Sequence, residues 1–128
     1  MAALQGVKIL LAESELFLAS VYATKLELEG CTVLHAEDGE QCLKLAEKHV
    51  PDVILLDTHI PKLDGFETLR RLRQNQTLAK IPVAMITDLC RKEDVERCLK
   101  EGAMEFMIKA HVVPSDMVRK VKKILHVA

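Results

Sequence analysis

Short apolar runs recur along the chain and are separated by longer segments in which apolar and polar residues are mixed. The runs occupy residues 7–12, 31–36, 52–57, 82–87 and 104–109. Four of them show no alternation of polar and apolar residues, which is typical of strands covered on both faces in a parallel sheet. The last run, 104–109, is the weakest of the five. The pattern therefore predicts five strands, most of them buried on both faces.

Between and after these runs, apolar residues are spaced three or four positions apart, which predicts helices that bury one face. The predicted buried stripes are Leu18, Tyr22 and Leu26; Cys42, Leu45, Ala46 and His49; Phe66, Leu69 and Leu72; Val95, Cys98, Leu99 and Gly102; and Val118, Val121 and Leu125. Gly30 is a candidate helix stop, and Pro114 suits a first helical position. Five alternating strands and helices predict a doubly wound α/β fold with a central parallel sheet.

The composition narrows the classes of partner. The chain has 128 residues, which fits one domain with a real core. Its 18 Lys and Arg residues balance 19 Asp and Glu residues, so the net charge is -1. That balance gives no electrostatic case for nucleic acid or a membrane surface as the main partner. With no Trp, one Tyr and three Phe, the chain also lacks aromatic residues on which bases could stack. We expect no direct binding to nucleic acid.

The sequence shows no pattern typical of a membrane span, a secretory signal or a cysteine-based redox or metal motif. No apolar stretch approaches the length of a membrane span, and the first ten residues lack the basic start and apolar core of a secretory signal. We therefore expect a cytoplasmic protein without membrane association. The four cysteines form neither a C-x-x-C pair nor a zinc-like spacing. Cys42 and Cys98 lie on predicted apolar helix faces, so we expect them to be small core residues.

The residues that end the predicted strands carry most of the candidate chemistry. In an open parallel sheet, ligands bind at the carboxyl ends of the strands, near the point where the strand order reverses. The strand-ending residues are Glu13 and Ser14, then Asp57, Thr87 and Lys109. A strand can end on Asp because Asp is a common loop residue. Here carboxylates, a hydroxyl and an ammonium converge on one edge, which favours a reactive site.

Four motifs resemble the receiver domains of response regulators in two-component signalling. They are KILLAES at 8–14, DVILLDTHIPKLDG at 52–65, PVAMIT at 82–87 and GAMEFMIK at 102–109. The resemblance covers essentially the whole chain. It implies a flavodoxin-like (βα)5 fold with strand order 2-1-3-4-5, and a single receiver domain over residues 1–128 with no output domain. It further implies a signalling protein and not an enzyme.

The resemblance also implies a role for each strand-ending residue. Asp57 matches the residue that accepts a phosphoryl group from a sensor histidine kinase or a phosphotransfer protein. Mg²⁺, which prefers oxygen ligands, would be held by Glu13, Asp57 and the backbone carbonyl of His59. Thr87 and Lys109 would each contact a phosphoryl oxygen.

The same resemblance implies how a signal leaves the site. Phosphorylation would draw Thr87 inward, Phe106 would follow as the second switch residue, and a neighbouring surface would change. The downstream protein target would bind the face formed by the fourth helix, the fifth strand and the fifth helix. Leu89, two positions past Thr87, is expected to shield the acylphosphate from water.

The sequence departs from the family pattern after the first strand. Receivers usually carry two adjacent acids there, whereas this chain has Glu13 followed by Ser14. The loss of one carboxylate predicts weak Mg²⁺ binding. Ser14 is expected to cap the first helix, with Glu15 already on that helix and pointing elsewhere. The alternative function is a degenerate receiver that binds its partner independently of phosphorylation.

Overall fold

A computed structural model describes residues 3–88, 92–109 and 113–127, so Leu89 and Cys90 lie outside the described residues. The strands are β1 (Lys8–Ala12), β2 (Thr32–Ala36), β3 (Val53–Asp57), β4 (Val83–Thr87) and β5 (Glu105–Ile108). The helices are α1 (Leu16–Leu28), α2 (Gly39–His49), α3 (Gly65–Gln74), α4 (Lys92–Lys100) and α5 (Pro114–Ile124). Every strand falls inside the apolar run that predicted it.

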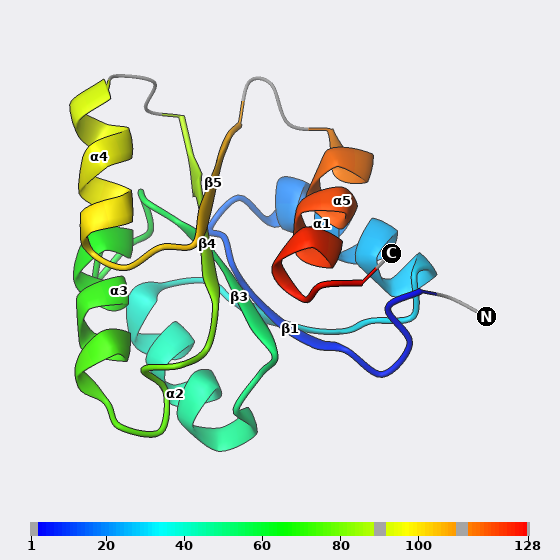
Figure 1. Ribbon diagram of the computed structural model, residues 1–128, viewed down its shortest axis with the longest axis horizontal. Helices are drawn as coiled ribbons and strands as arrows, with labels where there is room; N and C mark the ends of the chain where they lie inside the picture. Colours follow the sequence, from blue (N-terminus) through cyan, green and yellow to red (C-terminus); the bar gives the residue numbers. More distant parts are fainter. Residues whose placement is uncertain (1–2, 89–91, 110–112, 128) are drawn as a thin grey trace.

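The five strands form one parallel sheet in the order β2-β1-β3-β4-β5. Helices α1 and α5 cover one face of the sheet, and α2, α3 and α4 cover the other (Figure 1). The strand order reverses between β1 and β3, which brings the ends of these two strands to the position where ligands bind in this class of fold. The predicted fold class and strand order are confirmed.

Two apolar cores fill the space between the sheet and its two helical layers. Alternation along each strand divides the side chains, so that Ile54, Leu56 and Met85 face α2, α3 and α4. Val53 and Leu55 face α1 and α5, where Tyr22 and Val121 complete the second core. Central strands β3 and β4 are buried along their full length, as the sequence predicts for strands covered on both faces.

The edge strand β2 differs from the prediction. Thr32 is exposed, the three residues after it are half-buried, and only Ala36 is buried. A strand at the sheet edge has a neighbour on one side alone, so an apolar run does not by itself guarantee burial on both faces.

In the part of the chain that the structure describes, no helix is both long enough and apolar enough to cross a membrane.

The helix ends follow local sequence rules. The Asp38 and Asp64 side chains each accept a hydrogen bond from a backbone N–H in the first turn of α2 and α3. Gly30 follows α1 with a φ of 97°, a left-handed conformation that favours glycine, which confirms it as the helix stop. The predicted core cysteines Cys42 and Cys98 are buried and free. Burial raises the pKa of the Cys42 thiol to about 12, which disfavours thiolate chemistry there.

Candidate functional site

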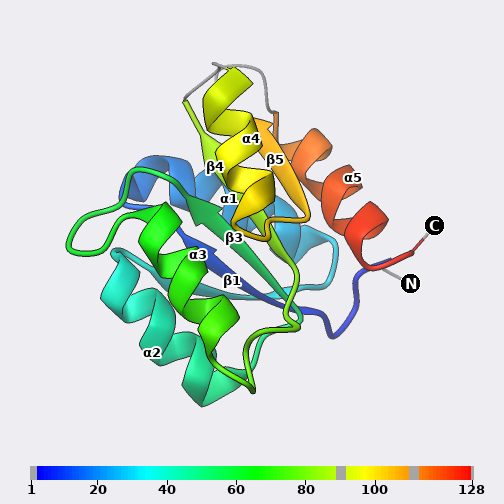
Figure 2. The same cartoon turned by 60° about the vertical axis from the view of Figure 1, so that its left-hand side comes forward.

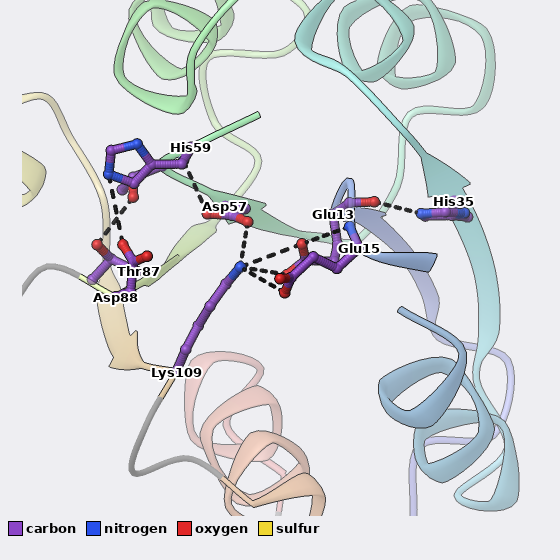
Figure 3. Close-up of polar contacts among 9 residues, drawn as sticks. Glu13, Glu15, His35, Asp57, His59, Thr87, Asp88 and Lys109 are labelled. Atoms are coloured by element: carbon purple, nitrogen blue, oxygen red, sulfur yellow. Dashed lines mark hydrogen bonds and ion pairs between the residues drawn. The ribbon is translucent and has the colours of Figure 1, made fainter. Parts of the chain in front are cut away.

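Three charged side chains from separate strand ends meet at one edge of the sheet (Figure 3). The Lys109 Nζ, just after β5, lies 2.6 Å from Asp57 Oδ2 at the end of β3. It also lies 3.1 Å from Oε1 of Glu13, the residue after β1. Both acids are buried, with 0% of Glu13 and 1% of Asp57 exposed. The structure therefore brings together three of the residues that the sequence singled out.

The Asp57 carboxylate is held in place by its local backbone. The His59 N–H donates a hydrogen bond to Asp57 Oδ1 at 2.9 Å. The Gly65 N–H, at the start of α3, donates to the Thr58 carbonyl at 3.0 Å. A Cβ atom at Gly65 would lie 2.3 Å from the Asp57 carbonyl oxygen, so only glycine allows this close approach. The beginning of α3 is thus fixed against the strand end that carries Asp57.

The electrostatics of the site reflect a single ammonium among several acids. Burial raises the pKa of the Glu13 carboxyl, and the charge of Asp57 raises it further, against the hydrogen bonds from Glu15 N–H and Lys109. Burial alone would lower the pKa of Lys109. The hydrogen bond to Asp57 and the charges of Asp57 and Glu13 outweigh burial, so the Lys109 pKa is raised and its side chain stays charged.

The site offers oxygen atoms that suit a divalent cation. Glu13 Oε1 is buried and accepts no hydrogen bond, although the Lys109 ammonium lies close enough to attract it. A second carboxylate, Asp57, shares that ammonium, so the two acids are only partly neutralised. Over the described ranges, no three His, Cys, Asp or Glu side chains form a ready-made metal site. The two carboxylates of Glu13 and Asp57 fit Mg²⁺, which usually binds one or two protein carboxylates. The predicted ligand set, which adds the backbone carbonyl of His59, stays a prediction.

The prediction for Ser14 and Glu15 is wrong. Helix α1 begins at Leu16, and its N-cap is Glu15, whose side chain makes no capping hydrogen bond. The backbone N–H of Glu15 donates instead to Glu13 Oε2 at 3.1 Å. The helix therefore starts one residue later than a Ser14 cap would place it. The Glu15 carboxylate consequently points back to the site, with Oε2 3.5 Å from Lys109 Nζ (Figure 3).

Thr87 ends β4 beside the acidic group, and its side chain is buried. The Thr58 hydroxyl donates a hydrogen bond to Thr87 Oγ1 at 3.0 Å. At the surface, His59 Nε2 lies 3.6 Å from Asp88 Oδ1. Neither contact follows from the strand-end reasoning, because its list of candidate residues includes neither Thr58 nor Asp88. The pairing register of β3 and β4 is the signal that places Thr58 next to Thr87.

The other predicted switch residue, Phe106, is half-buried on β5 and packs against the core below α2, α3 and α4. His35, which we did not assign to the site, contacts the backbone carbonyl of Glu13 through Nε2 at 2.7 Å. The roles of Asp57, Thr87, Lys109 and Phe106 in phosphorylation and switching stay predictions.

Comparison with known proteins places this geometry in a family. The family model of the response regulator receiver domain matches residues 9–122. The alkaline phosphatase synthesis transcriptional regulatory protein PhoP of Bacillus subtilis is 37% identical over 118 residues, which cover 92% of this chain and 48% of that protein. The DNA-binding regulator RpaA of Synechocystis is 33% identical with the same coverage. The chain spans about half the length of the curated relatives it matches.

Solved structures agree with this placement. The receiver domain of a Francisella response regulator is 28% identical, with a TM-score of 0.85 over 91% of this chain and 94% of that one. The receiver domain of a sensor histidine kinase from Pseudomonas aeruginosa, described with a magnesium ion coordinated in its active-site cleft, is 28% identical. Its TM-score is 0.84 over 92% of this chain and 96% of that one. The chain therefore belongs to the response regulator receiver domain family of two-component signalling.

Proposed function

We propose that this receiver accepts a phosphoryl group on Asp57 from a sensor histidine kinase or a phosphotransfer protein. The observation that supports the proposal is the buried Asp57 carboxylate, fixed by the His59 N–H and paired with the Lys109 ammonium. A buried carboxylate at the end of a central strand has little structural purpose of its own. Its placement is explained if Asp57 is a nucleophile that needs a fixed orientation.

The transfer step needs only the phosphodonor, the Asp57 carboxylate and a proton from solvent. A carboxylate oxygen of Asp57 attacks the phosphorus of a phosphohistidine, so that an O–P bond forms and the donor's N–P bond breaks. The electron pair of the N–P bond stays on the imidazole nitrogen of the donor, which then takes up a proton. Lys109 compensates the negative charge that gathers on the phosphoryl oxygens, and Thr87 donates a hydrogen bond to one of them.

Mg²⁺ would be held by Glu13, Asp57 and the backbone carbonyl of His59, and when bound it supplies positive charge that lowers the repulsion between carboxylate and phosphoryl group. Binding would be weak, because Ser14 supplies no carboxylate. The exposed carboxylate of Glu15 lies at the edge of the site and compensates only in part. Restoring the acid with Ser14→Asp should therefore strengthen Mg²⁺ binding, as measured by calorimetric titration of both proteins.

We further propose that this receiver signals in the cytoplasm by contact with a protein target. Phosphorylation would shift Thr87 and Phe106, and the face formed by α4, β5 and α5 would present a changed surface. The packing of Phe106 against the core below α4 supports a link between β5 and that helix. Ser14 is the feature behind the alternative, a receiver that works independently of phosphorylation, whereas the pairing of Asp57 with Lys109 favours phosphorylation.

The experiment that tests the proposal is phosphorylation by a small acyl phosphate with Mg²⁺, followed by intact-protein mass measurement. We expect wild type to gain the mass of one phosphoryl group, and Asp57→Asn to gain none. Asp52→Asn is the matched control, since it makes the same change on an exposed carboxylate at the opposite end of β3. Persistent labelling of Asp57→Asn, or an unlabelled wild type, would refute the proposal.

A further inference from the structure

Thr58 and Thr87 lie side by side on the sheet face that α2, α3 and α4 cover. In the register of β3 and β4, Leu56 is opposite Met85 and Asp57 is opposite Ile86, so Thr58 and Thr87 are the next pair. Because side chains alternate along a strand, Thr87 projects to the same face as Met85, and Thr58 to the same face as Leu56. Asp57 projects the other way, towards Lys109.

The two hydroxyl groups are joined by a buried hydrogen bond. Thr58 Oγ1 donates to Thr87 Oγ1 at 3.0 Å, and 1% of Thr58 and 2% of Thr87 is exposed. The Thr58 backbone is fixed as well, since its N–H donates to the Ile86 carbonyl and its carbonyl accepts from the Gly65 N–H. Thr58 is therefore a rigid donor that holds the Thr87 hydroxyl on the face of the sheet that α2, α3 and α4 cover.

We propose that Thr58 is a positioning residue that holds Thr87 in the unphosphorylated arrangement and so sets the threshold of the switch. The inference rests on the proposed function, in which Thr87 turns to a phosphoryl oxygen on Asp57. When Thr87 turns, Thr58 loses its acceptor inside the protein. A buried hydroxyl that loses its partner opposes the change, which keeps the switched state rare before phosphorylation.

The size of the shift between the two arrangements follows from the net free-energy contribution of one buried hydrogen bond. Such bonds shift an equilibrium by about two- to twelvefold. Removing the Thr58 hydroxyl should therefore raise the population of the switched state by roughly that factor. A small phosphodonor that reacts with the switched state would then phosphorylate Asp57 faster, by up to the same factor.

The test compares Thr58→Val, which keeps the shape of the side chain but removes the hydroxyl, with Thr58→Ser, which restores it. Thr68→Val is the matched control. Thr68 is also fully buried, and its hydroxyl donates to the Leu63 and Asp64 carbonyls, away from Thr87. Each protein is assayed for its phosphorylation rate with a small acyl phosphate and Mg²⁺, and for the NMR signals of Phe106 without donor.

We expect Thr58→Val to be phosphorylated severalfold faster than wild type, with shifted Phe106 signals before any donor is added. Thr58→Ser and Thr68→Val should keep the wild-type rate and Phe106 signals, even where Thr68→Val loses stability. An unchanged or slower Thr58→Val rate would overturn the inference. If wild type takes no phosphoryl group, the proposed function fails. In that case the NMR signals of Phe106 still test the inference about Thr58, and identical signals in wild type and Thr58→Val would overturn it.

Discussion

Helices α3 and α4 follow neighbouring strands and lie on the same face of the sheet (Figure 2). Their side chains are nevertheless buried to very different extents. Five of the ten residues of α3 are buried, namely Gly65, Phe66, Thr68, Leu69 and Leu72. Only Cys98 is buried among the nine described residues of α4. The sequence predicts a full buried stripe on α4, but Leu99 is 49% exposed and Val95 is half-buried.

The contacts that join α4 and the residues just after it to α3 include two made by arginine side chains. The Arg97 guanidinium lies 3.9 Å from the centre of the Phe66 ring. Beyond the end of α4, Arg73 of α3 donates to the Gly102 carbonyl at 2.8 Å. Segments with few buried apolar contacts open and shift at low free energy. Helix α3 therefore anchors the strand end that carries Asp57, while α4 is able to respond to events at that site.

The largest difference between the two helices should lie in their contributions to global stability. Leu69→Ala removes a fully buried side chain from α3 and should lower the free energy of unfolding by about 2–5 kcal/mol. Leu99→Ala makes the same change on the half-exposed face of α4 and should stay within about 0.5 kcal/mol of wild type. Urea denaturation of both variants measures the contrast. Equal losses would show that α4 is packed as firmly as α3.

A second prediction concerns Lys109, which follows β5 and connects it to the acids of β1 and β3. Lys109→Met leaves the buried Glu13 and Asp57 carboxylates without a cation, and should cost about 1–3 kcal/mol at neutral pH. Lys92→Met is the control, because Lys92 forms an exposed ion pair with Glu96 at 3.8 Å, and should cost no more than about 0.5 kcal/mol.

The pH dependence of the Lys109→Met variant has a definite sign. Burial already raises the pKa of Glu13 in the folded chain, and removal of the ammonium should raise that pKa further. A carboxyl group with a raised folded pKa destabilises the fold when it is ionised. The deficit of the variant should therefore be small below the unfolded pKa of about 4 and should grow as the pH rises through the folded pKa. A deficit that shrinks with rising pH would contradict this account of the site.

The smallest expected effect concerns the contact between α4 and α3. Arg97→Ala removes the guanidinium from the Phe66 ring and should weaken local protection of α4 by about 0.5–1 kcal/mol. Native-state amide exchange measures this, with α3 as the internal reference. Lys100→Ala, an exposed residue on the same helix, is the control and should leave protection unchanged. Equal loss of protection in both helices would mean that they move as one unit.

Several parts of this arrangement could be predicted from the sequence. The apolar runs locate all five strands, and the rule that ligands bind at the carboxyl ends of parallel strands predicts that Glu13, Asp57 and Lys109 lie together, as they do in the structure. These predictions succeeded because they depend on the periodicity and topology of the whole chain.

The failures concern features that depend on one residue's surroundings. Helical spacing predicts which residues share a face, but not whether a neighbour covers that face, so Leu99 was wrongly expected to be buried. Ser14 is expected to cap α1 because Ser is a common cap, but the helix starts one residue later, with Glu15 at the N-cap and the Glu15 N–H bonded to the Glu13 side chain. The hydrogen bond between Thr58 and Thr87 depends on strand register, which the sequence pattern does not specify.

The central claim is that a phosphoryl group on Asp57 changes α4 and β5 while α3 stays in place. Hydrogen–deuterium exchange of the backbone amides of α3, α4 and β5, measured before and after treatment with acyl phosphate and Mg²⁺, tests this claim most directly. The account predicts altered exchange in α4 and β5 of wild type, little change in α3, and no change anywhere in Asp57→Asn. Equal changes in α3 and α4, or a response that persists in Asp57→Asn, would contradict it.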